Sequence, residues 1–141
     1  MNYIVSVLLL ISVMVSNIEN SVSIKINEIE STKGNIQVSV FVNQKDFENK
    51  KPYMKKVFPK KDYLKNGVFQ CDFNLPNGTY GIVILDDENA DGQMDYNFFK
   101  MPKEGYGFSN FIHESLSKPK FSDFQFTLNK NQEFNIVLRY F

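Results

Sequence analysis

The chain has 141 residues, with sixteen basic and sixteen acidic side chains, so its formal net charge at pH 7 is zero. This balance argues against nucleic acid or an acidic lipid surface as an electrostatic partner. The length predicts a single domain that can bury a core without disulfides or metals. Fourteen Phe and seven Tyr supply much of that core.

The N-terminus predicts export. Residues 4–15, IVSVLLLISVMV, form an uncharged apolar run, shorter than the roughly 20 residues that a membrane-spanning helix needs. Such a run is typical of a signal peptide, which we assign to residues 1–16 with cleavage near Ser16. The mature chain, residues 17–141, is then periplasmic, secreted or held at the cell surface, with no transmembrane segment.

Strand patterns dominate the remainder. Apolar and polar residues alternate over 22–26, 36–42 and 69–75, and residues 79–86 are apolar on both faces, which is typical of a central strand. The turns TKGN and PNG predict two hairpins, and NKNQ joins the last two strands, 124–128 and 133–141. The fold class is therefore all-β, as a single antiparallel β-sandwich of about seven strands.

Residues 44–66 interrupt this rhythm with eight lysines, two prolines and interleaved aromatic residues. One interpretation is an anion-binding patch. The other is a long crossover that contains a short helix, with its lysines in solvent. The sequence favours the crossover because no base-stacking motif or glycine-rich phosphate cradle accompanies the charge.

No convincing catalytic set is visible. Cys71 is the only cysteine and shares its strand parity with Phe69, Phe73 and Leu75, so it is predicted to face the core. His113 is the only histidine and lies in a loop-like stretch without an orienting partner. We therefore predict a protein that is not an enzyme.

The segment DDENADGQMD, residues 86–95, packs five carboxylates, two amides and one glycine into ten positions directly after the central strand. Its spacing matches most of an EF-hand calcium loop, with Gly92 at the sharp bend. Phe98 stands where that loop has its bidentate Glu, and the flanks are strands, so no EF-hand is present. The predicted ligands of a modified calcium site are Asp87, Asn89, Asp91, Gln93 and Asp95, with Glu104 as a weaker candidate.

Two interpretations of this loop stay open. Crowded carboxylates repel one another unless a cation or solvent separates them, which favours Ca²⁺ as a cofactor. Alternatively, Asp87, Asn89 and Asp91 form Asx-turns and Gly92 adopts a left-handed conformation. Both interpretations use the same residues.

The order LPNGTYGIVILDDENADGQMDYNFFKMPKEGYGFSN resembles the diagnostic segment of a bacterial exported family, domain of unknown function 2141. The resemblance covers most of the mature chain in strand order. It implies an immunoglobulin-like or transthyretin-like sandwich with no established activity. It also implies one surface feature, made of Asp87, Asn89, Asp91, Gly92, Asp95, Glu104, Gly105, Tyr106, Gly107, Phe108 and Ser109.

We expect a non-enzymatic binding or structural module of the cell envelope, with an envelope protein, a peptide or a glycan as its partner. One alternative is a carbohydrate- or peptide-binding module that uses Tyr106 and Phe108 as a stacking platform. A further alternative is a hydrolase with Asp95 and Glu104 as paired carboxylates, which needs the two groups about 5–9.5 Å apart in a cleft.

Overall fold

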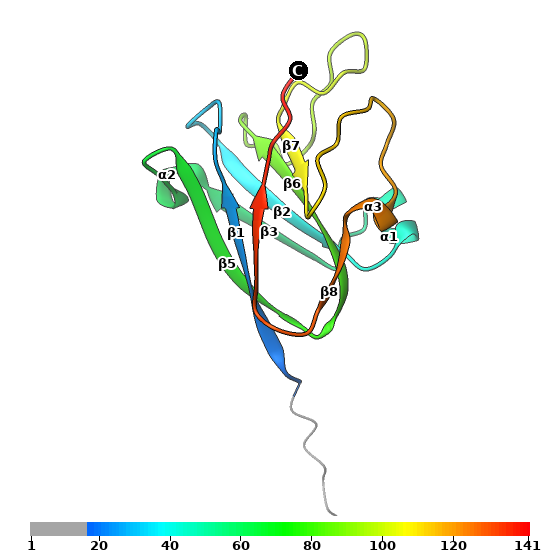
Figure 1. Cartoon of the computed structure of the whole chain (residues 1–141). Coiled ribbons are helices and arrows are strands. Elements are labelled where there is room, and N and C mark those ends of the chain that lie inside the picture. Colours follow the sequence, from blue (N-terminus) through cyan, green and yellow to red (C-terminus); the bar gives the residue numbers. More distant parts are fainter. Residues whose placement is uncertain (1–16) are drawn as a thin grey trace, which may run out of the picture.

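The computed structural model describes residues 17–141, so the predicted signal peptide lies outside the described residues. Figure 1 shows two sheets packed face to face as a β-sandwich. The strands are β1 (Glu19–Ile26), β2 (Asn35–Phe41), β3 (Met54–Pro59), β4 (Leu64–Lys65), β5 (Val68–Pro76), β6 (Gly78–Asp87), β7 (Tyr106–Phe108), β8 (Gln125–Leu128) and β9 (Gln132–Ile136). The three helices are α1 (Gln44–Glu48), α2 (Lys60–Tyr63) and α3 (Phe121–Phe124).

One sheet has the strand order β4-β5-β1-β9, and the other has the order β3-β2-β6-β7 with β8 also paired to β6. The predicted central position of β6 is confirmed, because β2 lies on one side and both β7 and β8 lie on the other. The predicted sandwich is likewise confirmed. Its pairs are antiparallel except for β1 and β9, which run parallel.

The two predicted hairpins are wrong, and the last two strands do not pair with each other either. β1 and β2 belong to different sheets, and so do β5 and β6, and β8 and β9. Each short turn carries the chain across the sandwich. An alternating strand shows which of its faces is buried, but it does not show which strand lies beside it. Two consecutive strands can therefore bury their apolar faces against each other instead of pairing edge to edge.

The core lies between the sheets and is almost entirely aliphatic and aromatic. The alternating residues of β1, β2 and β5 are buried there, and Cys71 is among them as predicted. Burial, above all, raises the pKa of the Cys71 thiol to about 12, with a smaller contribution from Asp72. The thiol is therefore protonated and unreactive at neutral pH.

Residues 44–66 form more than a crossover. They contain α1, the edge strand β3, α2 and the short strand β4. Asn43 caps α1 by accepting a hydrogen bond from Asp46 N at 2.8 Å. β3 was missed because most of its side chains face solvent, so its lysine-rich sequence does not alternate.

A second, smaller cluster covers the outer face of β6 beside α1 and α3. It consists of Phe41, Phe47, Phe108, Phe121 and Phe124. The side chain of Gln44 accepts a hydrogen bond from Phe121 N at 2.6 Å and so joins the two helices. The apolar outer face of β6 is thereby covered, which explains why this strand is apolar on both faces.

Within residues 17–141, no helix is long and apolar enough to cross a membrane.

Candidate functional site

The segment between β6 and β7, residues 88–105, projects from the end of the sandwich where the C-terminus also lies (Figure 1). Gly34, in the β1–β2 connection, lies directly beneath its start. Gly34 has φ +76°, and a Cβ at this position would lie 2.6 Å from the Glu88 carbonyl oxygen. Only glycine fits there, so the base of the projecting segment is packed against the body of the protein.

Asp87 organises the first half of the acidic loop. Its buried carboxylate accepts hydrogen bonds from Asp91 N at 3.1 Å and from Gly92 N at 2.8 Å. Asn89 and Asp91 likewise accept from backbone amides two residues ahead, at 3.2 and 2.9 Å. Gly92 has φ +80°. The structure therefore contains the predicted Asx-turns at Asn89 and Asp91 and the predicted left-handed glycine, whereas Asp87 makes no Asx-turn and accepts from amides four and five residues ahead.

Glu104 closes the loop from the other side. Its side chain is only 5% exposed, and its two oxygens accept hydrogen bonds from Glu88 N at 3.1 Å and Asp95 N at 3.2 Å. Burial is the largest cause that raises the pKa of Glu104, and Asp87 and Asp95 raise it further. The structure thus brings Glu104 to the acidic loop, where it binds the loop backbone.

The amide of Asn89 lies between the remaining carboxylates. Its Nδ2 donates to Asp95 Oδ2 at 2.8 Å and to Asp91 Oδ2 at 3.2 Å. Gln93, another predicted ligand, is exposed, and its backbone N–H donates to Asp91. Across residues 17–141, no group of three or more His, Cys, Asp or Glu side chains is arranged to hold a metal ion. Calcium binding stays a prediction.

The structure reveals a feature that the sequence interpretation missed, the aromatic turn of residues 96–101. Phe98 is 95% exposed and Phe99 is 80% exposed, and their rings meet edge to face at 5.5 Å. Asn97 holds the turn: its Oδ1 accepts from Phe99 N at 2.9 Å and Met101 N at 3.0 Å. Adjacent Phe residues in a segment without strand alternation, between Asn and Lys, were the available signal.

The proposed stacking platform requires correction at Phe108. This ring is only 6% exposed and packs against Phe124, with ring centroids 5.0 Å apart, so it offers no open surface. Tyr106 is half-buried. Its ring stacks on Phe141 at 6.2 Å, and its hydroxyl bonds to His113 Nδ1 at 3.0 Å. A ligand-binding role for Tyr106 stays a prediction.

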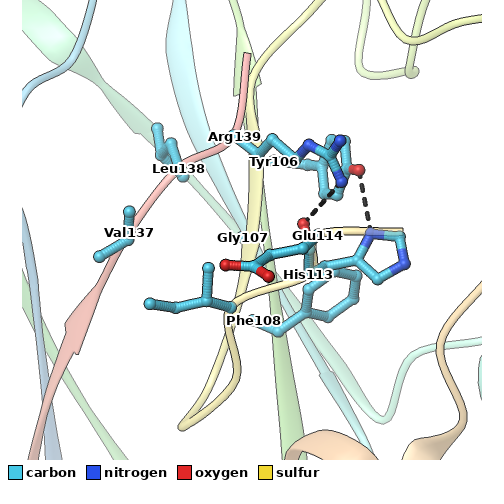
Figure 2. Close-up of a pocket in the computed structure, with 9 residues that line it drawn as sticks. Tyr106, Gly107, Phe108, His113, Glu114, Val137, Leu138 and Arg139 are labelled. Carbon is cyan, nitrogen blue, oxygen red and sulfur yellow. Dashed lines mark hydrogen bonds between the residues drawn. The ribbon is translucent and has the colours of Figure 1, made fainter. Parts of the chain in front are cut away.

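A pocket of about 260 Å³ lies beside Tyr106 (Figure 2). Its polar groups mostly bond to one another. His113 Nε2 donates to the Ser117 carbonyl at 2.6 Å, so Nδ1 accepts from the Tyr106 hydroxyl. Arg139 donates to the carbonyl oxygens of His113 and Ser115 at 2.9 and 3.0 Å. These bonds hold the 109–117 loop onto the C-terminal segment. Ser115 Oγ also lies 3.3 Å from His113 Nε2, but this nitrogen carries the proton that it donates to the Ser117 carbonyl, so it does not serve as a base for the serine hydroxyl.

The geometry of Asp95 and Glu104 does not favour the hydrolase alternative. Glu104 and Asp95 are close, since the Glu104 carboxylate accepts the Asp95 amide. Both Glu104 oxygens, however, are engaged with backbone amides inside the protein. In this arrangement Glu104 stabilises the loop and does not present an acid to a substrate.

The fold and the site together define a class: a single-domain β-sandwich with a long, internally hydrogen-bonded acidic loop after its central strand. Among known protein families, residues 24–136 match the family described as "Uncharacterized protein conserved in bacteria (DUF2141)". The chain belongs to this family. Neither the curated proteins nor the solved structures gave a match.

Proposed function

We propose that the chain is an exported, non-enzymatic binding module of the bacterial cell envelope, and that the aromatic turn is its recognition surface. The observation that carries this proposal is the exposure of Phe98 and Phe99 at the tip of an ordered turn. Large exposed aromatic rings contribute nothing to a core, whereas at interfaces they supply much of the binding energy.

The contacts beneath the turn support this role. Asn97 fixes the turn internally, and Tyr96 and Pro102 form a β-bridge at its base. Asp87 and Glu104 hold the adjoining acidic loop through four backbone amides. A surface that is ordered before binding loses less conformational entropy when a partner docks.

Calcium is part of the proposal as a stabiliser of the acidic loop. One side-chain oxygen each of Asp91 and Asp95 lies on the Asn89 Nδ2 group, which separates the two carboxylates. An arriving cation would displace this amide and offset the carboxylate repulsion. Oxygen ligands on a flexible loop suit Ca²⁺ better than Mg²⁺, which demands near-ideal octahedral geometry.

Cosedimentation with the envelope fraction of a producing bacterium tests the recognition surface. We expect the purified chain to sediment with this fraction and the double variant Phe98→Ser/Phe99→Ser to remain in the supernatant. Leu116→Ser is the matched control, because Leu116 is 73% exposed on a different loop. Equal sedimentation of the double variant and the wild type would remove the aromatic turn from the proposal.

Export is tested separately. Fractionation of the producing cells, followed by N-terminal sequencing of the purified chain, should locate the protein outside the cytoplasm with a new N-terminus near residue 17. An unprocessed chain in the cytoplasmic fraction would contradict this half of the proposal.

A further inference from the structure

Lys60 and Asp86 form a fully buried pair in which the Lys60 Nζ contacts Asp86 Oδ1. Lys60 begins α2 directly after β3, and Asp86 lies near the end of β6. β2 lies between these strands, and its Ile36 pairs with Phe58 on one side and Asp86 on the other. Removing two charges from water is costly unless good hydrogen bonds satisfy them.

The hydrogen bonds around this pair are incomplete in one place. Nζ donates to the Ser31 carbonyl oxygen at 2.8 Å, and Asp86 Oδ2 accepts from the Tyr140 hydroxyl at 2.6 Å. Asp86 Oδ1, by contrast, has no hydrogen-bond partner among the described residues, although Nζ touches it. The amine therefore meets the carboxyl group outside hydrogen-bond geometry.

We propose that Lys60 and Asp86 condense to form an intramolecular isopeptide bond. Proton transfer within the pair gives a neutral amine and a neutral carboxylic acid. Nζ then attacks Cγ of Asp86, the Cγ–Oδ1 bond breaks, and Oδ1 leaves as water with the acid proton and one amine proton. The product is a secondary amide, and the step needs no oxidant, reductant or co-reactant.

The surroundings fit the product better than the ion pair. The amide N–H retains the Ser31 carbonyl as its acceptor, and the amide oxygen, formerly Oδ2, retains the Tyr140 hydroxyl. The atom that departs is Oδ1, the one without a hydrogen bond. Condensation thus removes both buried charges together with the oxygen that has no hydrogen bond.

Tyr140 and the buried setting also favour the reaction. The Tyr140 hydroxyl is placed to stabilise negative charge that develops on Oδ2 when Nζ attacks. Burial, with the hydrogen bond to Asp86, raises the pKa of Tyr140, so the hydroxyl keeps its proton. Two reactive groups fixed in contact have effective molarities far above those of free solutes.

The cross-link would fasten α2 to the end of β6, from which the acidic loop projects. It closes a segment of 27 residues, from position 60 to position 86. A cross-link of this span restricts the unfolded chain as a disulfide does. A chain with one cysteine cannot form an internal disulfide.

Mass spectrometry of the purified, folded full chain tests the proposal. With the N-terminus determined by sequencing, we expect an intact mass one water molecule below the sequence mass, and a branched proteolytic peptide that joins Lys60 to Asp86. Lys60→Met should have its full sequence mass, whereas the neighbouring control Lys61→Met should still lose water. A wild-type chain that unfolds cooperatively yet keeps its full mass after prolonged incubation overturns the proposal.

Tyr140→Phe tests the assigned role of the hydroxyl. We expect the water loss to become at least tenfold slower in a time course of intact mass, and Tyr63→Phe, a change of the same kind at a more exposed site, to leave the rate unchanged. An unchanged rate in Tyr140→Phe would remove Tyr140 from the reaction and leave the cross-link to be judged on the wild-type mass.

Discussion

Gly105 lies against the ring of Tyr140, and this contact joins the end of the 88–105 segment to the C-terminal residues. A Cβ at Gly105 would lie 2.7 Å from Tyr140 Cζ. The Gly105 carbonyl oxygen also accepts a hydrogen bond from Asp86 N at 2.8 Å, so the backbone at Gly105 cannot move away from the Tyr140 ring without breaking this bond. Glycine is therefore required at position 105 by the close approach of an aromatic ring.

We predict that Gly105→Ala lowers the free energy of unfolding by about 1–3 kcal/mol, since overpacking forces neighbouring groups out of position. Chemical denaturation measures the change. Lys103→Ala, an exposed substitution two residues away, should stay within about 0.5 kcal/mol of the wild type. Equal stabilities of the two variants would show that the Tyr140 ring moves aside without cost.

Asp87→Ala should destabilise the acidic loop. The substitution leaves the amides of Asp91 and Gly92 without their acceptor. Loss of a buried hydrogen-bond partner costs about 1–3 kcal/mol. Hydrogen exchange of residues 88–95 should become faster, and Asp72→Ala on the exposed face of β5 should not change it. Unchanged exchange in Asp87→Ala would show that the turns form without this carboxylate.

The acidic loop should make stability depend on pH in an unusual direction. Burial first, and Asp87 and Asp95 next, raise the pKa of Glu104 in the folded state above its ordinary value of 4.5. Between the unfolded and folded pKa values, the folded state binds more protons, so stability falls as pH rises through this window.

Glu104→Gln isolates this effect. The unfolding free energy of the wild type minus that of the variant should decrease as pH rises above about 4.5 and level off once Glu104 is ionised in both states. Denaturation at a series of pH values measures this difference. A difference that instead grows with pH would mean that the two backbone amides outweigh burial.

The sequence predicted the sandwich and the central position of β6 because both depend on which faces are apolar. It failed on strand pairing at β1 and β2, where one short turn serves equally for a hairpin and for a crossing between sheets. The sequence also did not predict the edge strand β3. This strand is held by hydrogen bonds to β2, and most of its side chains face water, so it has no alternating apolar pattern.

In the candidate site, too, features that depend on local sequence were predictable and features that depend on long-range packing were not. The Asx-turns of Asn89 and Asp91 follow from local spacing and were predictable. The exposure of Phe98 and the burial of Phe108 were not, because both are aromatic residues in glycine- and asparagine-rich stretches. Only the long-range packing of Phe108 on α3 decides between them.

Substitutions of Phe98 and Phe124 should differ in their effect on stability, because only the Phe124 ring is buried. Phe98→Ser should change the unfolding free energy by less than about 0.5 kcal/mol, because the ring is exposed. Phe124→Ala should lower it by about 3–5 kcal/mol, because that ring, on the last residue of α3, is fully buried and packs against Phe47 of α1. Thermal or chemical unfolding measures both. A large loss of stability in Phe98→Ser would give this residue a structural role and weaken its assignment to recognition.

Calcium should stabilise the folded chain if the acidic loop binds it. At 100 times the dissociation constant, one site adds about 2.7 kcal/mol to the unfolding free energy. Extracellular calcium modules bind in the range of about 10⁻⁴–10⁻³ M, so thermal unfolding should be followed up to tens of millimolar Ca²⁺, with Mg²⁺ as the matched control. Asp91→Ala/Asp95→Ala should abolish the shift and still fold.

Asn89→Asp sharpens the calcium test, because it replaces the amide that separates Asp91 from Asp95 with a third carboxylate. Without calcium, this variant should be less stable than the wild type through charge repulsion. With calcium, it should regain more stability than the wild type gains, because the added carboxylate is a better ligand than an amide. If Ca²⁺ changed the melting temperature of neither protein, the calcium proposal would be wrong, and hydrogen-bonded turns alone would account for the loop.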